Sequence, residues 1–326
     1  MKIQINSDVI EWLLEEENPS VRYWTLRDIF EKPEDSPEVK NAREEIMNSH
    51  LVKVILENQN PHGFWVSLNP YIPKYRATYH QLLILSELGA SPCEKIRRAI
   101  EFVFKNYQYE SGHFSGKMIK TKRGRKSKLK DGACLTGNLL RALIHFEYLS
   151  DKRTQRTIEF SVENHEDGWS CRAYPIDREK VFPKNCYMGG VKPLIAFSMI
   201  PEKERKRDVR EIIKKEIEIY LENEIFMYLR DDKGERKAKF GWKRFGFPLF
   251  YQSDALEVLD TLTKLGVKDE RMKRAIDLVL SKSDERGRWK LENTFNEKMW
   301  IDIEEKKMPS KWITLKALRV LKRYYG

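Results

Sequence analysis

The cysteines of this 326-residue chain are the residues whose spacing could most directly form a chemical site. Cys134, Cys171 and Cys186 are separated by 37 and 15 residues, which is not the spacing of a compact Cys-x-x-Cys knuckle. They could hold a tetrahedral zinc ion if the fold brings them together with a fourth ligand. The candidates for that ligand are His80, His165 and Asp131. The alternatives are buried reduced thiols, a nucleophile activated by a nearby base, or a disulfide.

A second set of residues could bind and transform an apolar ligand that carries a charged head. Aromatic and cationic side chains cluster just before, or at the start of, strongly apolar segments, and an aromatic lining with a few polar groups is the usual form of a small-molecule site. We expect the lining to include Trp24, Tyr79, Phe247, Tyr251 and Trp312, and the anion to be held by Arg22, Arg76 and Lys311. The candidates for a catalytic acid or base are Asp254, Asp131 and His80.

Two kinds of helix alternate along the chain and would position these residues. The strongly apolar kind, which needs burial on two sides, is predicted at Ser20–Phe30, Tyr75–Leu88, Cys134–Leu149, Met188–Met199, Phe250–Leu265 and Trp312–Tyr325. The amphipathic kind, with one apolar stripe and therefore one buried side, is predicted at Val9–Glu16, Pro37–Glu57, Pro92–Tyr107, Lys152–Glu163, Arg207–Phe226 and Asp269–Ser281. A ring of apolar helices inside a ring of amphipathic ones satisfies both patterns; an open solenoid of helical hairpins is the alternative.

A short sequence motif, here called a mark, recurs between an amphipathic helix and the next apolar one. Residues 59–65 read Gln-x-x-x-Gly-x-Trp, residues 108–114 read Gln-x-x-x-Gly-x-Phe, and related copies end at Trp169 and Trp289. The marks at Trp65, Phe114 and Trp169 lie 49 and 55 residues apart, and a degenerate copy is expected near residues 234–242. A fixed period of this length indicates a repeat architecture.

These marks resemble the Gln-Trp repeats of the terpenoid cyclase and protein prenyltransferase β-subunit superfamily. The resemblance covers nearly the whole chain and implies an all-α fold: an α/α toroid of about six inner and six outer helices with a repeat of about 50 residues. It implies a pocket at the amino-terminal ends of the inner helices. It also implies that Gln59, Trp65, Gln108, Trp169 and Trp289 tie each outer helix to the following turn.

This chain does not reproduce the catalytic motifs of that superfamily. The chain has neither an Asp-x-Asp-Asp nor an Asp-Asp-x-x-Asp element, since Asp254 stands alone in its segment. The segment from Asp131 to Gly137 resembles the zinc-binding helix of the prenyltransferase group only in its Cys-Leu-x-Gly core. Zinc is therefore an open cofactor prediction, and a zinc-dependent prenyltransferase-like transferase is an alternative to a cavity that binds an isoprenoid-like or other apolar anionic molecule. Whether the protein is an enzyme stays open.

Eight lysines and arginines between Lys117 and Lys130 account for most of the net charge of +11. We interpret this basic loop, residues 117–130, as an insertion in a single domain that spans residues 1–326. It is either solvated, or a lid over an anionic ligand, or a contact for a partner. A non-enzymatic scaffold that uses this loop to bind a protein, nucleic acid or an anionic surface is the other alternative function. Nucleic acid is the less favoured partner, because no aromatic residues are interleaved in the loop.

No apolar run approaches the roughly 18–20 residues that cross a bilayer, and the first eight residues lack the apolar core of a signal peptide. We therefore expect a cytoplasmic protein without a transmembrane segment.

Overall fold

The computed structural model describes residues 6–120, 132–169, 186–229 and 236–326, and helices predominate in these ranges. Six apolar helices, here called the inner helices, are α2 (Pro19–Asp28), α5 (Thr78–Glu87), α8 (Ala133–His145), α10 (Tyr187–Met199), α12 (Ala255–Lys264) and α14 (Lys311–Tyr325). The amphipathic helices are α1 (Ser7–Leu13), α3 (Pro37–Asn48), α4 (His50–Glu57), α6 (Glu94–Tyr107), α9 (Lys152–Glu163), α11 (Arg207–Glu222) and α13 (Lys273–Ser281).

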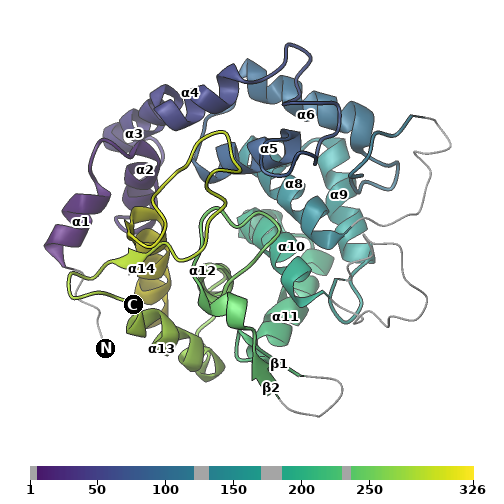
Figure 1. Ribbon diagram of the computed structural model, residues 1–326. Helices are drawn as coiled ribbons and strands as arrows, with labels where there is room; N and C mark the ends of the chain where they lie inside the picture. The colour runs from purple at the N-terminus through teal and green to yellow at the C-terminus, as the bar shows by residue number, and fades with distance from the viewer. Residues whose placement is uncertain (1–5, 121–131, 170–185, 230–235) are drawn as a thin grey trace.

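The inner helices lie around a common centre, with the amphipathic helices outside them (Figure 1). Contacts join each inner helix to the next from α5 through α8, α10, α12 and α14, and α14 returns to α2. The remaining pair is joined by the indole N–H of Trp24 on α2, which donates to the carbonyl of Glu87 on α5 at 3.0 Å. The helices α3, α6, α9, α11 and α13 pack against α2, α5, α8, α10 and α12 respectively.

The strands are short and lie in the connections between helices. Strand β1 (Met227–Leu229) pairs antiparallel with β2 (Arg236–Ala238), and β3 (Trp289–Lys290) pairs antiparallel with β4 (Pro309–Ser310). Three short 3₁₀ helices, η1 (Glu202–Glu204), η2 (Phe240–Lys243) and η3 (Glu270–Met272), complete the described elements. The all-α class is thereby confirmed for the described residues.

One predicted helix is wrong in its extent. The amphipathic segment Pro37–Glu57 forms two helices, because Ser49 adopts an extended conformation with φ −63° and ψ 146°. Its hydroxyl then caps α4 by accepting from the backbone N–H of Val52, which is the ordinary role of serine at a helix start. The other predicted helices are present, with ends that differ from the predicted ones by a few residues, and Lys152–Glu163 has the predicted bounds.

The recurring tryptophans make the predicted tie to the preceding outer helix. The indole N–H of Trp65 donates to Ile55 O, that of Trp169 to Ser161 O, and that of Trp289 to Val279 O, each at 2.7 Å. Their rings are at most 3% exposed. Burial with a satisfied N–H is the arrangement expected of a structural tryptophan.

The glutamines and glycines of the same marks reach forward to the next outer helix. The amides of Gln59 and Gln108 donate to Lys95 O at 2.8 Å and Arg153 O at 2.9 Å. The glycine four residues after each glutamine, Gly63 or Gly112, has a positive φ and lies directly against the backbone of that helix. The mark at residues 59–65 therefore fastens two successive outer helices, α4 and α6, together. The degenerate copy expected at residues 234–242 begins outside the described residues.

The marks also bind the inner helices, through threonines that sequence reasoning missed. The backbone N–H groups of Trp65 and Trp289 donate to the hydroxyls of Thr78 and Thr314, at 3.2 and 2.9 Å. Both threonines lie in the first turn of an inner helix. Within the described residues, no helix is long and apolar enough to cross a membrane.

Candidate functional site

A cavity of about 150 Å³ lies at the centre of the ring. All six inner helices contribute to it, mainly from their carboxyl-terminal halves, and one loop residue, Phe247, completes the lining. Its lining residues are Trp24, Asp28, Ser86, Glu87, Arg141, His145, Ile195, Ser198, Met199, Phe247, Glu257, Asp260, Thr261, Lys264, Trp312, Lys316, Arg319 and Arg323. The resemblance implied a pocket at the opposite, amino-terminal ends of these helices.

Three of the predicted lining residues form the aromatic part of this cavity. Phe247 stacks on Trp312, with ring centroids 4.2 Å apart and ring planes 13° from parallel. Trp24 is fixed by the hydrogen bond from its indole to Glu87 O. Flat, rigidly held rings of this kind favour a ligand with an apolar or planar part.

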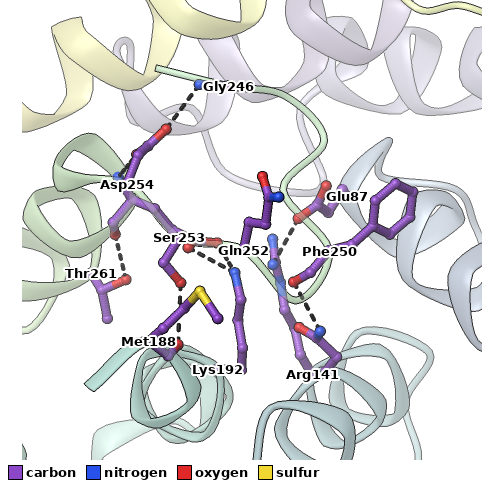
Figure 2. A network of polar contacts seen from close by, with 12 residues as sticks. Glu87, Arg141, Met188, Lys192, Gly246, Phe250, Gln252, Ser253, Asp254 and Thr261 are labelled. Atoms are coloured by element: carbon purple, nitrogen blue, oxygen red, sulfur yellow. Dashed lines mark hydrogen bonds and ion pairs between the residues drawn. The ribbon is translucent and has the colours of Figure 1, made fainter. Parts of the chain in front are cut away.

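Half of the lining residues are charged, and most of the charges are paired. Glu87 binds Arg141 at 2.7 Å, Asp28 binds Arg319 at 2.5 Å, and Asp260 binds Arg323 at 2.8 Å. Behind the wall, the ammonium of Lys192 lies 2.8 and 2.7 Å from the two carboxylate oxygens of Glu257. Figure 2 shows Arg141 extending to the carboxylate of Glu87, and Lys192 extending from a third inner helix.

The concentration of cations at the carboxyl-terminal ends of the inner helices has a physical cause. Helix carboxyl ends carry a partial negative charge, so arginine and lysine in the last turns are favoured. Lys264 and Arg323 lie in the last turns of α12 and α14, and Arg141 lies four residues before the last residue of α8. These cations are thus accounted for by helix ends and by the acidic partners already described.

Lys316 is accounted for by neither effect. It lies six residues into the 15-residue helix α14 and is 8% exposed. Within the described part of the chain its ammonium forms no ion pair, and it faces the ring of Phe247 at 5.0 Å from the centroid. A buried cation over an aromatic face is partly stabilised by that contact. Against the effect of burial, the charge of Lys316 also contributes to the lowered pKa of Asp260, but no carboxylate of the described residues forms an ion pair with Lys316.

Three other polar atoms in the cavity wall are buried without a hydrogen-bond partner among the described residues. They are the indole Nε1 of Trp312, the guanidinium Nε of Arg319 and the carboxylate Oε2 of Glu87. Buried polar groups are nearly always satisfied, and an exception calls for an unseen partner. Two of these three atoms can only donate, so the cavity presents more unused donors than acceptors.

Asp254, a predicted catalytic residue, caps helix α12 and is absent from the cavity lining. Its two carboxylate oxygens accept from the backbone N–H groups of Gly246 and Glu257, both at 2.8 Å (Figure 2). Burial, and then the charge of Glu257, raise the pKa of Asp254 to about 7, against the effect of these hydrogen bonds. A carboxylate that accepts two backbone donors at a helix start holds the chain in place.

His80 and two predicted lining residues, Tyr79 and Tyr251, meet at a separate small pocket. This pocket has a volume of about 30 Å³ and is lined by Tyr71, Tyr79, His80, Leu83, Cys134, Leu135, Asn138, Leu139, Phe250 and Tyr251. The rings of Tyr71, Tyr75 and Phe250 surround His80 at centroid distances of 5.0 to 5.5 Å. The aromatic residues on the amino-terminal side of the ring therefore fill that side by packing on one another.

The buried imidazole of His80 predicts a sensitivity of the fold to acid. Burial, with a smaller effect of Lys74, lowers the pKa of His80 to about 3. The pKa of histidine in the unfolded chain is near 6.5, so between pH 6.5 and 3 the unfolded state binds a proton that the folded state does not. The free energy of unfolding therefore falls as the pH falls through this range, by at most about 1.4 kcal/mol per pH unit, and is unaffected by His80 above it. We expect His80→Phe to remove that component from urea-unfolding curves measured between pH 7.5 and 4.5. The same substitution at the exposed His50 is the control, and equal pH dependence in both variants would contradict the assignment.

The three residues predicted to hold an anion do not meet at one place. Arg22 pairs with Glu16 at 2.9 Å, and Lys311 pairs with Glu15 at 2.5 Å. The guanidinium of Arg76 donates to the carbonyls of Met299 and Glu297. Each therefore has a structural partner outside the central cavity.

The cysteine prediction stays a prediction. Cys134 and Cys186 begin neighbouring helices, and a Cβ placed on Gly189 would lie 2.9 Å from the Cys186 sulfur and 3.8 Å from the Cys134 nitrogen. Cys171 and Asp131 lie outside the described residues. His165 is bound to Glu216 at 3.0 Å. Among the described residues, no group of three histidine, cysteine or acidic side chains is arranged to hold a metal ion.

The charged lining was missed because its residues are isolated in the sequence. Glu87, Arg141, Lys316 and Arg319 each stand within a helix whose other residues are mainly apolar. A charge on the buried side of an apolar helix is unusual. That pattern was the available signal for an ionic site inside the ring.

No family model matches the chain, and no curated protein matches it. Among solved structures, it is similar to a glycoside hydrolase from family 105 of C. acetobutylicum ATCC 824, with 13% identity, a TM-score of 0.48, and 98% of this chain and 99% of that chain covered. A protein from Actinoplanes has 10% identity, a TM-score of 0.46, and coverage of 94% and 90%. The type II terpene cyclase MstE from Scytonema has 13% identity, a TM-score of 0.37, and coverage of 86% and 98%. At these values the likeness assigns neither a reaction nor a ligand to this chain.

Proposed function

We propose that the protein is a single-domain α/α toroid whose central cavity binds a small anionic molecule with a planar apolar part. Its six inner helices are surrounded by six outer segments, one of which is divided into α3 and α4. The anion lies beside Lys316, and the planar part lies against Trp24 and Trp312. Residues 117–130 form an insertion outside this core. No reaction is included in the proposal.

The main support for this proposal is the set of hydrogen-bond donors in the cavity wall that have no acceptor among the described residues. The ammonium of Lys316 forms no ion pair with a carboxylate among the described residues, and the indole N–H of Trp312 and the Nε–H of Arg319 have no acceptor there. A ligand with several acceptor oxygens satisfies all three, as a carboxylate or phosphate would. Hydrogen bonds from charged donors to such groups are roughly twice as strong as neutral ones.

The charge of the wall favours the same ligand. Five cations and four carboxylates line the cavity. Lys264 and Lys316 are the lining cations for which the described residues provide no ion pair, and only Lys316 lies early in its helix, away from a helix carboxyl end.

A compact ligand fits this wall better than a long isoprenoid. Nine of the eighteen lining residues are charged. An isoprenoid chain would remove water from those charges without offering them hydrogen bonds, which is costly. A single ring with an anionic substituent needs only the aromatic side of the cavity and leaves the ion pairs hydrated.

The test uses phenyl phosphate as a probe and calorimetric titration as the measurement. We expect the wild-type protein to bind it and Lys316→Met to bind at least about tenfold more weakly, because a charged hydrogen bond contributes about 1.5–3 kcal/mol. The matched control is Lys322→Met, on the same helix and outside the lining. Phenol, which lacks the anion, is expected to bind more weakly than phenyl phosphate.

Unchanged affinity in Lys316→Met would overturn the proposed site. Equal loss in Lys316→Met and Lys322→Met would overturn it too, because α14 as a whole would then be responsible. The melting temperature of each variant shows whether it is folded.

A further inference from the structure

Exposed aliphatic side chains gather on the loop between Trp65 and helix α5. Val66, Leu68 and Ile72 are 50%, 51% and 58% exposed. They lie within seven residues of one another, whereas the other large exposed apolar residues of the described chain are scattered over four further segments. Exposed apolar clusters on a folded protein commonly mark an interaction surface.

Hydrogen bonds hold this loop in one shape. The side chain of Asn69 accepts from the backbone N–H groups of Tyr71 and Ile72, at 3.0 and 2.8 Å. The hydroxyl of Ser67 donates to Ile72 O, and the hydroxyl of Tyr107 on α6 donates to Leu68 O. The aliphatic side chains are therefore presented by a fixed backbone.

The backbone of Val66 adds to the evidence that the loop serves a partner. Its φ is 63°, and a β-branched residue in this region is a rare and unfavourable case. Because the Val66 side chain is half exposed, its packing within the described structure does little to stabilise this conformation. Strain of this kind persists where the surroundings or a function require it.

Exposed lysines lie on the loop and on a neighbouring segment, while the exposed acidic residues Glu110 and Glu297 lie on flanking segments. Lys74 is exposed at the end of the same loop, and Lys117 and Lys120 are exposed on the neighbouring segment. That segment is joined to the loop through Tyr107, whose carbonyl accepts from Ser115 N at 2.8 Å. No aspartate or glutamate occurs in residues 58–86 or 111–120.

We infer that this loop, residues 66–74, docks the protein on an anionic lipid bilayer. Aliphatic side chains enter the acyl boundary of a bilayer, and adjacent lysines bind anionic headgroups. A nucleic acid offers phosphates but would require aromatic side chains on which bases can stack, and the exposed residues here are aliphatic. The half-buried Tyr71 suits the wet edge of such an interface.

The docking loop and the central cavity lie at opposite ends of the inner helices. The loop precedes the first residue of α5, Thr78, whereas α5 lines the cavity with Ser86 and Glu87 at its other end. The two sites can therefore be tested separately on the same protein.

The test is co-sedimentation of the full chain with lipid vesicles. We expect binding to vesicles of phosphatidylcholine mixed with phosphatidylglycerol, weakened by salt, and weak binding to phosphatidylcholine alone. The double variant Leu68→Ser, Ile72→Ser should lower the partition coefficient at least about tenfold, since two aliphatic side chains leave the bilayer. Lys117→Gln with Lys120→Gln should lower it on anionic vesicles only.

The control is Phe30→Ser with Leu280→Ser, which removes two apolar residues exposed elsewhere, at 46% and 39%; we expect no more than a twofold change. Absence of binding to anionic vesicles would overturn the inference. So would equal binding by the Leu68/Ile72 variant, or preferential binding of single-stranded DNA. Unchanged affinity of that variant for phenyl phosphate shows that the cavity and the fold are intact.

Discussion

Replacing Gly112 by alanine is expected to lower the free energy of unfolding by about 3 kcal/mol or more. The φ of Gly112 is +102°, a conformation that residues with a side chain rarely adopt, and an added Cβ would lie 2.3 Å from the carbonyl oxygen of Arg156. That oxygen belongs to the backbone of α9, so it cannot move aside as a side chain would. Urea unfolding followed by circular dichroism measures the loss.

Gly116, four residues further on, provides the matched control. An added Cβ there meets nothing within 4 Å, so Gly116→Ala should change the stability by less than about 0.5 kcal/mol. If both variants were equally stable, the close approach of the Gly112 turn to α9 would be wrong, and with it the way in which successive outer helices are fastened together.

Replacing Glu257 by glutamine should destabilise the fold by about 3–5 kcal/mol, because it leaves a buried cation without its anion. The Lys192 side chain is fully buried between α10 and α12, and both carboxylate oxygens of Glu257 face its ammonium. Burial lowers the pKa of Lys192, and the Glu257 carboxylate opposes this change. Denaturant unfolding at neutral pH measures the effect.

A second variant separates the missing charge from a defect in packing. In Lys192→Met with Glu257→Leu, both charges are replaced by apolar side chains of similar length, and such replacements are often neutral or stabilising. We expect this double variant to recover most of the stability lost in Glu257→Gln. If the double variant were the less stable of the two, the ion pair would contribute more than its charge balance.

The helical architecture could be predicted because it depends on patterns that repeat. Alternation of apolar and amphipathic helices indicates two layers, and the recurring tryptophans occupy equivalent turns. The break at Ser49 could not be predicted from periodicity, since apolar residues keep their helical spacing on both sides of it. There a local capping hydrogen bond decides the backbone conformation.

The candidate site was only partly predictable for a different reason. Trp24, Phe247 and Trp312 could be predicted as aromatic lining. The proposed role of Lys316, in contrast, follows from the absence of an ion-pair partner among the described residues. Single charges in apolar helices do not reveal whether their partners lie within reach. Arg22 and Lys311 show the converse, because nearby acidic side chains already bind them.

The most direct test of the central claim is a crystal structure of the protein with bound phenyl phosphate. We predict phosphate oxygens within about 3.2 Å of the Lys316 ammonium and the Trp312 indole nitrogen, with the phenyl ring against Trp24 or Trp312. Phenyl phosphate bound only outside the ring, or a central cavity containing water while the probe is bound elsewhere, would contradict the account.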